Sequence, residues 1–422
     1  MKLWEFVRLK FAEAEVFIPI LCVHNLAKLI DLLTIERARA YAVLTMLLVC
    51  LIVLADFRRN PENFTANVDF PAFYNAGRIL DSHPWSSLYD HDLQERFYIQ
   101  LVPNTPHGDA RVLYFSYTPF FALLFAPLAL LPYRLALLSW SIISLVLFVI
   151  GFLRVWNTCH LQSQYKVSAL LIALSFLPFY AWCLLVGQSS AFGFFALAIA
   201  ISLDRKGKPL ASGLALSLLL YKPPLLVLFL PMLLVTRRCK TLAGFSLGAV
   251  VLGALSLAMI GPSGLPLYFR MLQSFSVLKL TGRRRTFHEI DLFSFFNSIF
   301  HDHVFLTIVL TIAVSVFVLV FLVREWSRVP SRAWTLAIPW TTILNLYFLV
   351  YDSTILILAV LLTFEWQGNP RALRWLVLAL FVAALFDLAR LGFQPLTFAI
   401  AAFGAYQGWV SKSQSAASRV EH

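Results

Sequence analysis

Long continuous apolar runs alternate with polar segments along most of the chain. A helix that crosses a membrane needs about 20 mostly apolar residues, and many of these runs approach that length. They lack the period-two alternation that is typical of membrane β-barrels. The pattern therefore predicts an all-α, polytopic bundle with candidate membrane helices at residues 41–55, 114–131, 135–153, 167–186, 189–203, 210–220, 225–235, 242–260, 304–323, 334–350, 354–364, 375–389 and 393–410.

The second candidate, from Tyr114 to Leu131, differs from the others because Pro119 and Pro127 interrupt it and Pro132 follows it. Proline removes a backbone donor and clashes with the preceding helical turn. If this run and the next one both crossed, the basic loop after the second would lie outside. We therefore interpret this run as a re-entrant or external surface segment. That interpretation predicts about twelve spans, with both termini in the cytoplasm.

Composition supports a membrane protein. Apolar residues make up 60% of the 422 residues, charged residues only 13%, and the mean hydropathy is +0.77. A soluble fold could not bury that much apolar surface, and a disordered chain would be far more polar. The five cysteines show neither metal-ligand spacing nor a disulfide framework.

Charge sets the expected orientation. Five short loops (residues 154–166, 204–208, 237–240, 324–332 and 365–374) hold thirteen Lys and Arg but only three acids. By the positive-inside rule these loops face the cytoplasm. We attribute the net charge of +12 to this rule and to anionic membrane lipids, and we expect no nucleic-acid partner.

The same rule divides the chain. Residues 1–36 are expected to form an interfacial cytoplasmic helix, residues 37–410 the transmembrane domain, and residues 411–422 a cytoplasmic tail. Two long polar stretches, at about residues 57–112 and 261–303, are then external loops that carry short helices. The first holds seven acids and five arginines, which suits an external domain.

Several short motifs follow one another on the side predicted to be external. They are Val68-Asp-Phe-Pro-Ala-Phe-Tyr-Asn-Ala-Gly77, Leu88-Tyr89, Tyr117-Thr-Pro-Phe-Phe121, Gly187-Gln188, Lys222-Pro-Pro-Leu225 and Tyr351-Asp352. The ordered series resembles the integral-membrane glycosyltransferases of the GT-C class. It is most similar to the family 87 mannosyltransferases, which use polyprenyl-phosphate sugars.

The resemblance covers residues 41–364 and implies a GT-C-type helical bundle with its active site on the external face. It implies transfer of a hexose, mannose by preference, from a polyprenyl-phosphate sugar to a lipid-linked or glycan acceptor. Many family members have a Ser-Pro and a His near the end of a late span. The corresponding stretch here, residues 345–353, contains no His.

Asp69 is the candidate catalytic base. An inverting transfer needs one carboxylate to take the acceptor's hydroxyl proton, and a phosphate leaving group needs no strong acid. Asp69 lies at the start of a predicted short external helix, near the first span. The alternative is that Asp69 only caps that helix. Asp56, at the end of the first span, is a competing base.

Lys222 is the most informative cation because no other charge lies near it in its apolar run. A charge in such a run usually faces a cavity or a partner, so contact with the donor phosphate is one interpretation. Snorkelling to the external interface is the other. Arg284 and His288, in the second external loop, could also hold the phosphate or simply face lipid headgroups.

The remaining candidates would bind the donor sugar or phosphate or orient Lys222. They are Tyr117, Gln188, Tyr221, Tyr351 and Asp352, each of which is also plausible as an ordinary turn or interface residue. We expect no metal, because no carboxylate cluster stands out, and Asp90-His91-Asp92 matches a metal-binding Asp-x-Asp only superficially. No cofactor is expected either.

Two other functions compete with the glycosyltransferase. A transporter or lipid-linked-sugar flippase would place ionisable groups near the membrane midplane, often in two matching halves. Here the polar groups gather at one face, and no inverted repeat is visible. A non-catalytic assembly factor would tolerate the loss of Asp69. We therefore expect a multi-pass enzyme of a bacterial plasma membrane, with its active site on the external, periplasmic side.

Overall fold

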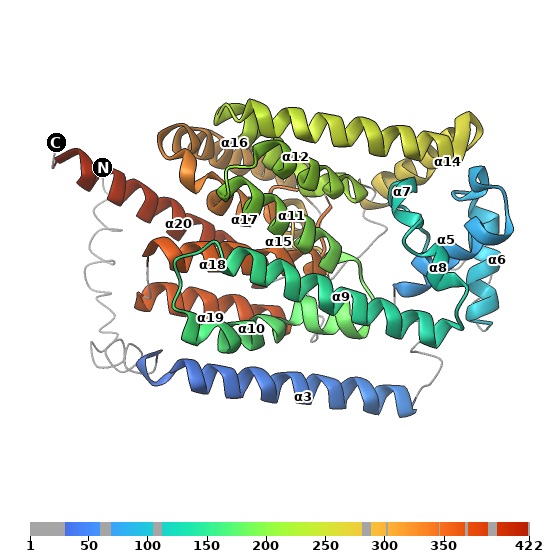
Figure 1. Cartoon of the computed structure of the whole chain (residues 1–422), viewed down its shortest axis with the longest axis horizontal. Helices are drawn as coiled ribbons and strands as arrows, with labels where there is room; N and C mark the ends of the chain where they lie inside the picture. The colour runs from blue at the N-terminus through green and yellow to red at the C-terminus, as the bar shows by residue number, and fades with distance from the viewer. Residues whose placement is uncertain are drawn as a thin grey trace, which may run out of the picture.

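The computed structural model describes residues 30–59, 69–103, 112–280, 288–300, 303–345, 347–367, 370–386 and 395–420. The molecule is a helical bundle (Figure 1), 83% helical and without strands among the described residues, so the all-α prediction is confirmed. Most of the predicted N-terminal interfacial helix, residues 1–29, lies outside the described residues.

The helices follow one another along the chain as α3 (Ile35–Arg59), α5 (Phe70–Ser82), η1 (Trp85–Ser87), α6 (His91–Leu101), α7 (Pro119–Ala122), α8 (Ala126–Ala129), α9 (Tyr133–Trp156), η2 (Ser163–Tyr165), α10 (Lys166–Leu174), η3 (Pro178–Leu185), α11 (Ser190–Arg205), α12 (Pro209–Ser217), η4 (Leu218–Tyr221), η5 (Pro223–Leu226), α13 (Phe229–Val235), α14 (Cys239–Leu280), α15 (Leu292–Ile299), α16 (Val304–Arg328), η6 (Pro330–Arg332), α17 (Ala333–Ile343), η7 (Val350–Ile355), α18 (Leu356–Gln367), α19 (Arg371–Leu385) and α20 (Pro395–Val420).

Fewer helices than expected are long and apolar enough to cross a membrane by themselves. Within the described residues there are five, formed by α3, α9, α14, α16 and the continuous η7–α18 segment, or six if the bent pair α10–η3 is one span. The predicted count of about twelve is therefore not confirmed. Several expected spans are short or broken, because proline and glycine interrupt the helical hydrogen bonds.

The run from residue 114 to 131 does not form one helix. It contains α7 and α8, of four residues each, and each begins at or next to a proline, Pro119 or Pro127. Proline is tolerated in the first turn of a helix, where its missing N–H would have no partner. The interruption expected from the prolines is thus present. Through α7 and α8 the segment packs against α5, and it does not form a helix of membrane-spanning length.

The five basic loops meet at one end of the bundle. Arg205 forms an ion pair with Glu365 at 2.5 Å and donates to the Thr158 carbonyl at 2.8 Å. Arg238 forms an ion pair with Asp204 and also donates to the carbonyl of Pro330. These bonds connect all five loops. The prediction from charge that they share one side of the protein agrees with this arrangement.

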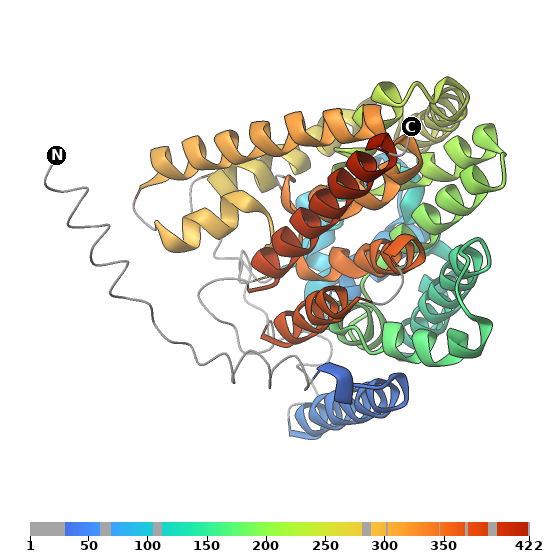
Figure 2. The same ribbon diagram turned by 90° about the vertical axis from the view of Figure 1, so that its left-hand side faces the viewer.

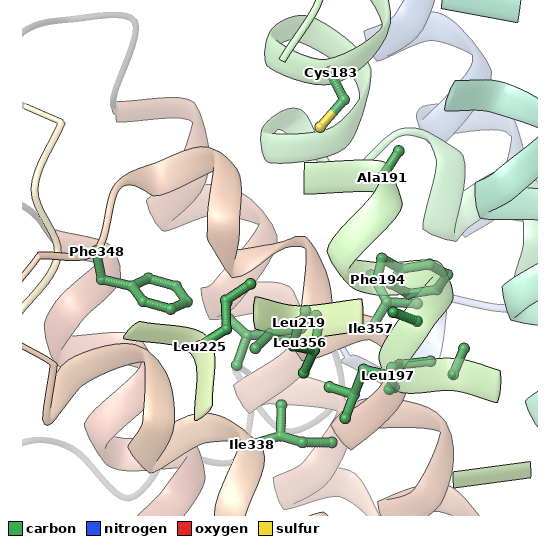
Figure 3. Close-up of a cluster of buried hydrophobic side chains, with 14 of the residues drawn as sticks. Cys183, Ala191, Phe194, Leu197, Leu219, Leu225, Ile338, Phe348, Leu356 and Ile357 are labelled. Carbon is green, nitrogen blue, oxygen red and sulfur yellow. The ribbon is translucent and has the colours of Figure 1, made fainter. Parts of the chain in front are cut away.

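Helix α11 lies at the centre of the core. It packs against α9 and α12, and most of its residues are buried, including Phe194 and Leu197. Figure 3 shows these two side chains beside Leu219 of η4 and Leu356 of α18. The long α14 lies at the edge, where Gly261 has φ of +62° and separates two helical parts. A side chain would disfavour that backbone conformation, so glycine permits the kink.

Candidate active site

Asp69 occupies the N-cap position of α5, but its side chain makes no capping hydrogen bond. Pro71, two residues on, has no backbone N–H to donate to the Asp69 carboxylate. The carboxylate instead accepts a hydrogen bond from the side-chain amide of Gln188, which lies 119 residues away in the sequence. This geometry contradicts the interpretation of Asp69 as a simple helix cap.

A tight turn brings Gln188 to this position. Gly187 has φ of +82°, and a Cβ there would lie 2.7 Å from Leu137 and 2.9 Å from Phe70. Only glycine combines that backbone conformation with such close packing. The Gln188 backbone N–H donates to the Trp182 carbonyl at 2.9 Å, which closes the turn after η3. The Gly-Gln motif therefore places an amide against the start of α5.

Lys222 and Asp352 form a buried ion pair. Their residues are only 6% and 2% exposed. Two prolines follow Lys222, and the chain bends there between the 3-10 helices η4 and η5. Because the ammonium group is inside the protein and meets a carboxylate, snorkelling to the membrane surface does not describe Lys222. The ion pair with Asp352 holds the Lys222 ammonium group in place.

Further groups hold this pair in place. The Asp352 carboxylate accepts from the Ser190 hydroxyl at 3.1 Å and from the Leu349 N–H at 3.3 Å. The Lys222 ammonium lies 4.9 Å from the centre of the Tyr351 ring and 5.6 Å from that of Tyr347. A cation is stabilised by an aromatic face at such distances.

Tyr117 and Tyr221 stack with nearly parallel rings, 5.9 Å apart. Tyr221 is fully buried, and its ring also packs on Phe121 and Phe192. Tyr117 interacts electrostatically with Asp352 and with Asp69. Burial raises the pKa of its phenol well above the usual range, and the charges of Asp352 and Asp69 raise it further. Tyr117 therefore remains a neutral hydroxyl close to both carboxylates.

The second long polar stretch, residues 261–303, also contributes residues beside the Lys222–Asp352 pair. The Val350 N–H donates to the His288 carbonyl at 2.8 Å, and the Ile290 N–H donates to the Phe348 carbonyl at 2.9 Å. The His288 ring packs edge-on against Trp182, at 5.0 Å between ring centres. His288 is thus beside the site, whereas Arg284 lies outside the described residues.

The structure joins most of the predicted site residues. Gln188 contacts Asp69, and Ser190, two residues later, contacts Asp352, so one short segment bridges both carboxylates. Sequence reasoning missed Ser190 and Tyr347, since a serine at a helix start and an aromatic in an apolar run are common structural residues. No group of three or more potential metal ligands occurs in the part of the chain that the structure describes.

The competing acids have other positions. Asp56 is exposed in the last turn of α3. Asp90 caps α6, where its side chain accepts from the Leu93 N–H at 2.9 Å. Asp90 therefore has a structural role as the cap of α6.

The length of helix α11 gives the distance between the candidate site and the basic end of the bundle. It begins at Ser190, in the site, and ends at Arg205, in the basic network, after 16 residues. At about 1.5 Å per residue it spans about 24 Å. By the same rule α9, with 24 residues, spans about 36 Å. Measured from the basic end, α9 therefore extends past the level of the charged site.

Comparison with known families identifies the chain. Residues 115–350, more than half of the sequence, match glycosyltransferase family 87. The chain therefore belongs to that family and is a membrane glycosyltransferase. The family match contains Gln188, Lys222 and the residues around them but begins after Asp69. No curated protein and no solved structure matches the chain significantly.

Proposed function

We propose that the protein transfers a hexose, mannose by preference, from a polyprenyl-phosphate sugar to the hydroxyl of a lipid-linked or glycan acceptor. The reaction takes place on the external face and inverts the anomeric centre, with Asp69 as the base. Family membership supports glycosyl transfer in general. The observation that carries the proposal is the contact of the Asp69 carboxylate with Gln188 instead of with its own helix.

Asp69 takes the proton of the acceptor hydroxyl as that oxygen attacks the anomeric carbon. The carbon–oxygen bond to phosphate breaks on the opposite face of the sugar, which inverts the configuration. The electron pair of that bond leaves with the polyprenyl phosphate. Since phosphate is a good leaving group, the reaction needs a base but no strong acid.

Two features favour Asp69 over Asp352 as the base. Asp352 is 2% exposed and bonded to Lys222, Ser190 and the Leu349 N–H, so its negative charge is already compensated on several sides. These partners occupy the Asp352 oxygens and leave little room for an acceptor hydroxyl. Asp69 is half-buried and accepts a hydrogen bond from the side-chain amide of Gln188, which orients its carboxylate.

Lys222 supplies the positive charge for the departing phosphate. The ammonium is held by Asp352 and the rings of Tyr347 and Tyr351 at a fixed position. Fixed charges in a dry site stabilise a developing anion without reorganisation. His288, on the neighbouring segment, provides a second contact for the phosphate, and Arg284 remains a candidate in the same loop.

Tyr117 and Tyr351 provide neutral hydroxyls and ring faces for the sugar. Tyr221 has no exposed surface, so in this proposal it supports Tyr117 by stacking and does not touch the sugar itself.

The proposal is tested by Asp69→Asn, assayed with polyprenyl-phosphate mannose and a membrane lipid extract. Asparagine keeps an oxygen that can accept from Gln188 but cannot take the proton. We expect transfer to fall by at least about 100-fold. The matched control is Asp81→Asn, because Asp81 is exposed on the same helix, α5, and should be neutral. Turnover of Asp69→Asn near the wild-type rate would refute the assignment of the base.

Donor and stereochemistry are measured in the same system. Parallel reactions with polyprenyl-phosphate glucose and galactose test the preference for mannose. Nuclear magnetic resonance of the product reports whether the anomeric configuration is inverted. Equal use of all donors would contradict the sugar preference, and retention would contradict the single-displacement mechanism.

A further inference from the structure

An apolar cavity lies between α3 and the bent segment η3. Its volume is about 100 Å³, and it is lined by Val49, Ile52, Val53, Ala181, Trp182 and Val186. We call it the α3–η3 groove. Helix α3 lies along the edge of the bundle and packs on it only lightly (Figures 1 and 2), with Ala42 and Val49 as its buried residues. The groove is therefore only partly enclosed, at the outer edge of the bundle.

The groove is continuous with the candidate active site. Val186 directly precedes the Gly187–Gln188 turn that contacts Asp69. Trp182 lines the groove, its carbonyl accepts from the Gln188 N–H, and its ring packs against His288. The Trp182 side chain therefore lies between the apolar groove and the candidate active site.

The chemistry of the lining restricts the occupant. The lining is apolar, and apolar cavities stay dry and accept hydrocarbons. Its depth is also informative. Val53 and Val49 precede Arg59, the basic end of α3, by six and ten residues, or about 9 and 15 Å of helix. An occupant at this level has its polar end beside the site and its hydrocarbon below the membrane surface.

We propose that the α3–η3 groove binds the first isoprenoid units of the donor's polyprenyl chain, next to the phosphate. This inference rests on the proposed function, which requires a lipid-borne donor. The occupant is an isoprenoid chain rather than bulk lipid, because the groove leads directly to the turn that positions the base.

The groove acts through alignment. A chain that moves from lipid into a protein groove exchanges one apolar surround for another and gains little hydrophobic free energy. Fixing its first units restricts where the phosphate and the anomeric carbon can lie, which is the contribution of positioning to catalysis. A blocked groove should therefore raise the KM for a long-chain donor.

The first test is Ile52→Trp, whose larger ring fills the groove. It is compared with Leu51→Trp on the same helix, because Leu51 does not line the groove and is 63% exposed. Each variant is assayed with a full-length polyprenyl-phosphate sugar and with a short methyl-phosphate sugar, which has no isoprenoid unit to enter the groove. We expect Ile52→Trp to raise the KM for the long donor by about tenfold and to leave the short donor unchanged. Leu51→Trp should change neither.

The second test measures binding without turnover. A photoreactive benzoylphenylalanine at position 52, or at position 51 as control, is irradiated with radiolabelled polyprenyl phosphate in phospholipid vesicles. Labelling at 52 and not at 51 supports the proposal. Labelling by phospholipid alone, or equal labelling at both positions, would overturn it. A wild-type protein that transfers from neither donor would refute the proposed function, and the cross-link would still decide the groove.

Discussion

The buried pair of Lys222 and Asp352 offers the sharpest separation of folding from catalysis. Their side chains are 7% and 1% exposed, so each charge depends on the other for compensation. Removing one partner of such a pair leaves an unpaired buried charge, which costs about 3–5 kcal/mol. We therefore expect Lys222→Met and Asp352→Leu each to lower the free energy of unfolding in detergent by that amount.

The double variant should be less destabilised than the sum of the two singles. Met and Leu leave no buried charge, and replacing a buried ion pair by apolar residues is often nearly neutral. The coupling energy from this double-mutant cycle should exceed about 1 kcal/mol. The matched control is Arg371→Met, because Arg371 and its partner Asp31 are 64% and 36% exposed. An exposed pair contributes little, so this variant should change the free energy of unfolding far less than either single variant of the buried pair.

Transfer activity should not recover with stability. If Lys222 contacts the donor phosphate, its loss costs about 10–1000-fold in kcat/KM, in the single and in the double variant. Lys222→Arg keeps the charge and should restore part of the rate. Activity is measured with polyprenyl-phosphate mannose on folded fractions after size-exclusion chromatography. A stable double variant with wild-type kcat/KM would show that the pair is only structural.

Two further predictions concern stability and sidedness. Asp69→Ala should lower the free energy of unfolding by about 1–3 kcal/mol, because the buried Gln188 amide loses its acceptor. This destabilisation should vanish in a Gln188→Ala background. A destabilisation that persists there would indicate that Asp69 caps α5. The exposed Cys239 should react with an impermeant maleimide only from the cytoplasmic side. Cys159 should stay unlabelled, because burial and, after it, the charge of Glu365 raise the pKa of its thiol to about 12. Labelling of Cys239 from outside would reverse the proposed orientation.

The arrangement of the loops could be predicted from sequence because it follows from charge. Basic residues on short loops share one side of a membrane protein, and Arg205 and Arg238 do meet acids from other loops at one end. The opposite grouping also agrees, since Gln188, Lys222 and Asp352 converge at the other end. The charge pattern therefore predicts which loops share a side of the bundle, although it does not predict the contacts between them.

The individual contacts could not be predicted in the same way. Lys222 and Asp352 are 130 residues apart, and no local signal pairs them among several possible acids. Asp69 illustrates a second limit. Its position before Phe70-Pro71 fits a helix cap, yet its side chain turns to Gln188 because the tertiary structure supplies a better donor. Local capping preferences are weaker than a buried amide brought within reach by a tight turn.

The prediction of about twelve spans was not confirmed, and the reason bears on function. Hydropathy finds apolar segments, whereas crossing a bilayer also requires length. The segments nearest the site are short: Pro209–Tyr221 ends in the turn that carries Lys222, and α11, with 16 residues, begins at Ser190. They are short because the chain turns back at the site before it reaches the level where α9 begins. Turns and broken helices are tolerated at membrane depth only where protein or a cavity surrounds them. The short helices therefore place the buried Lys222–Asp352 pair inside the bundle, and under the proposed function the lipid-linked sugar must reach it from the surrounding membrane.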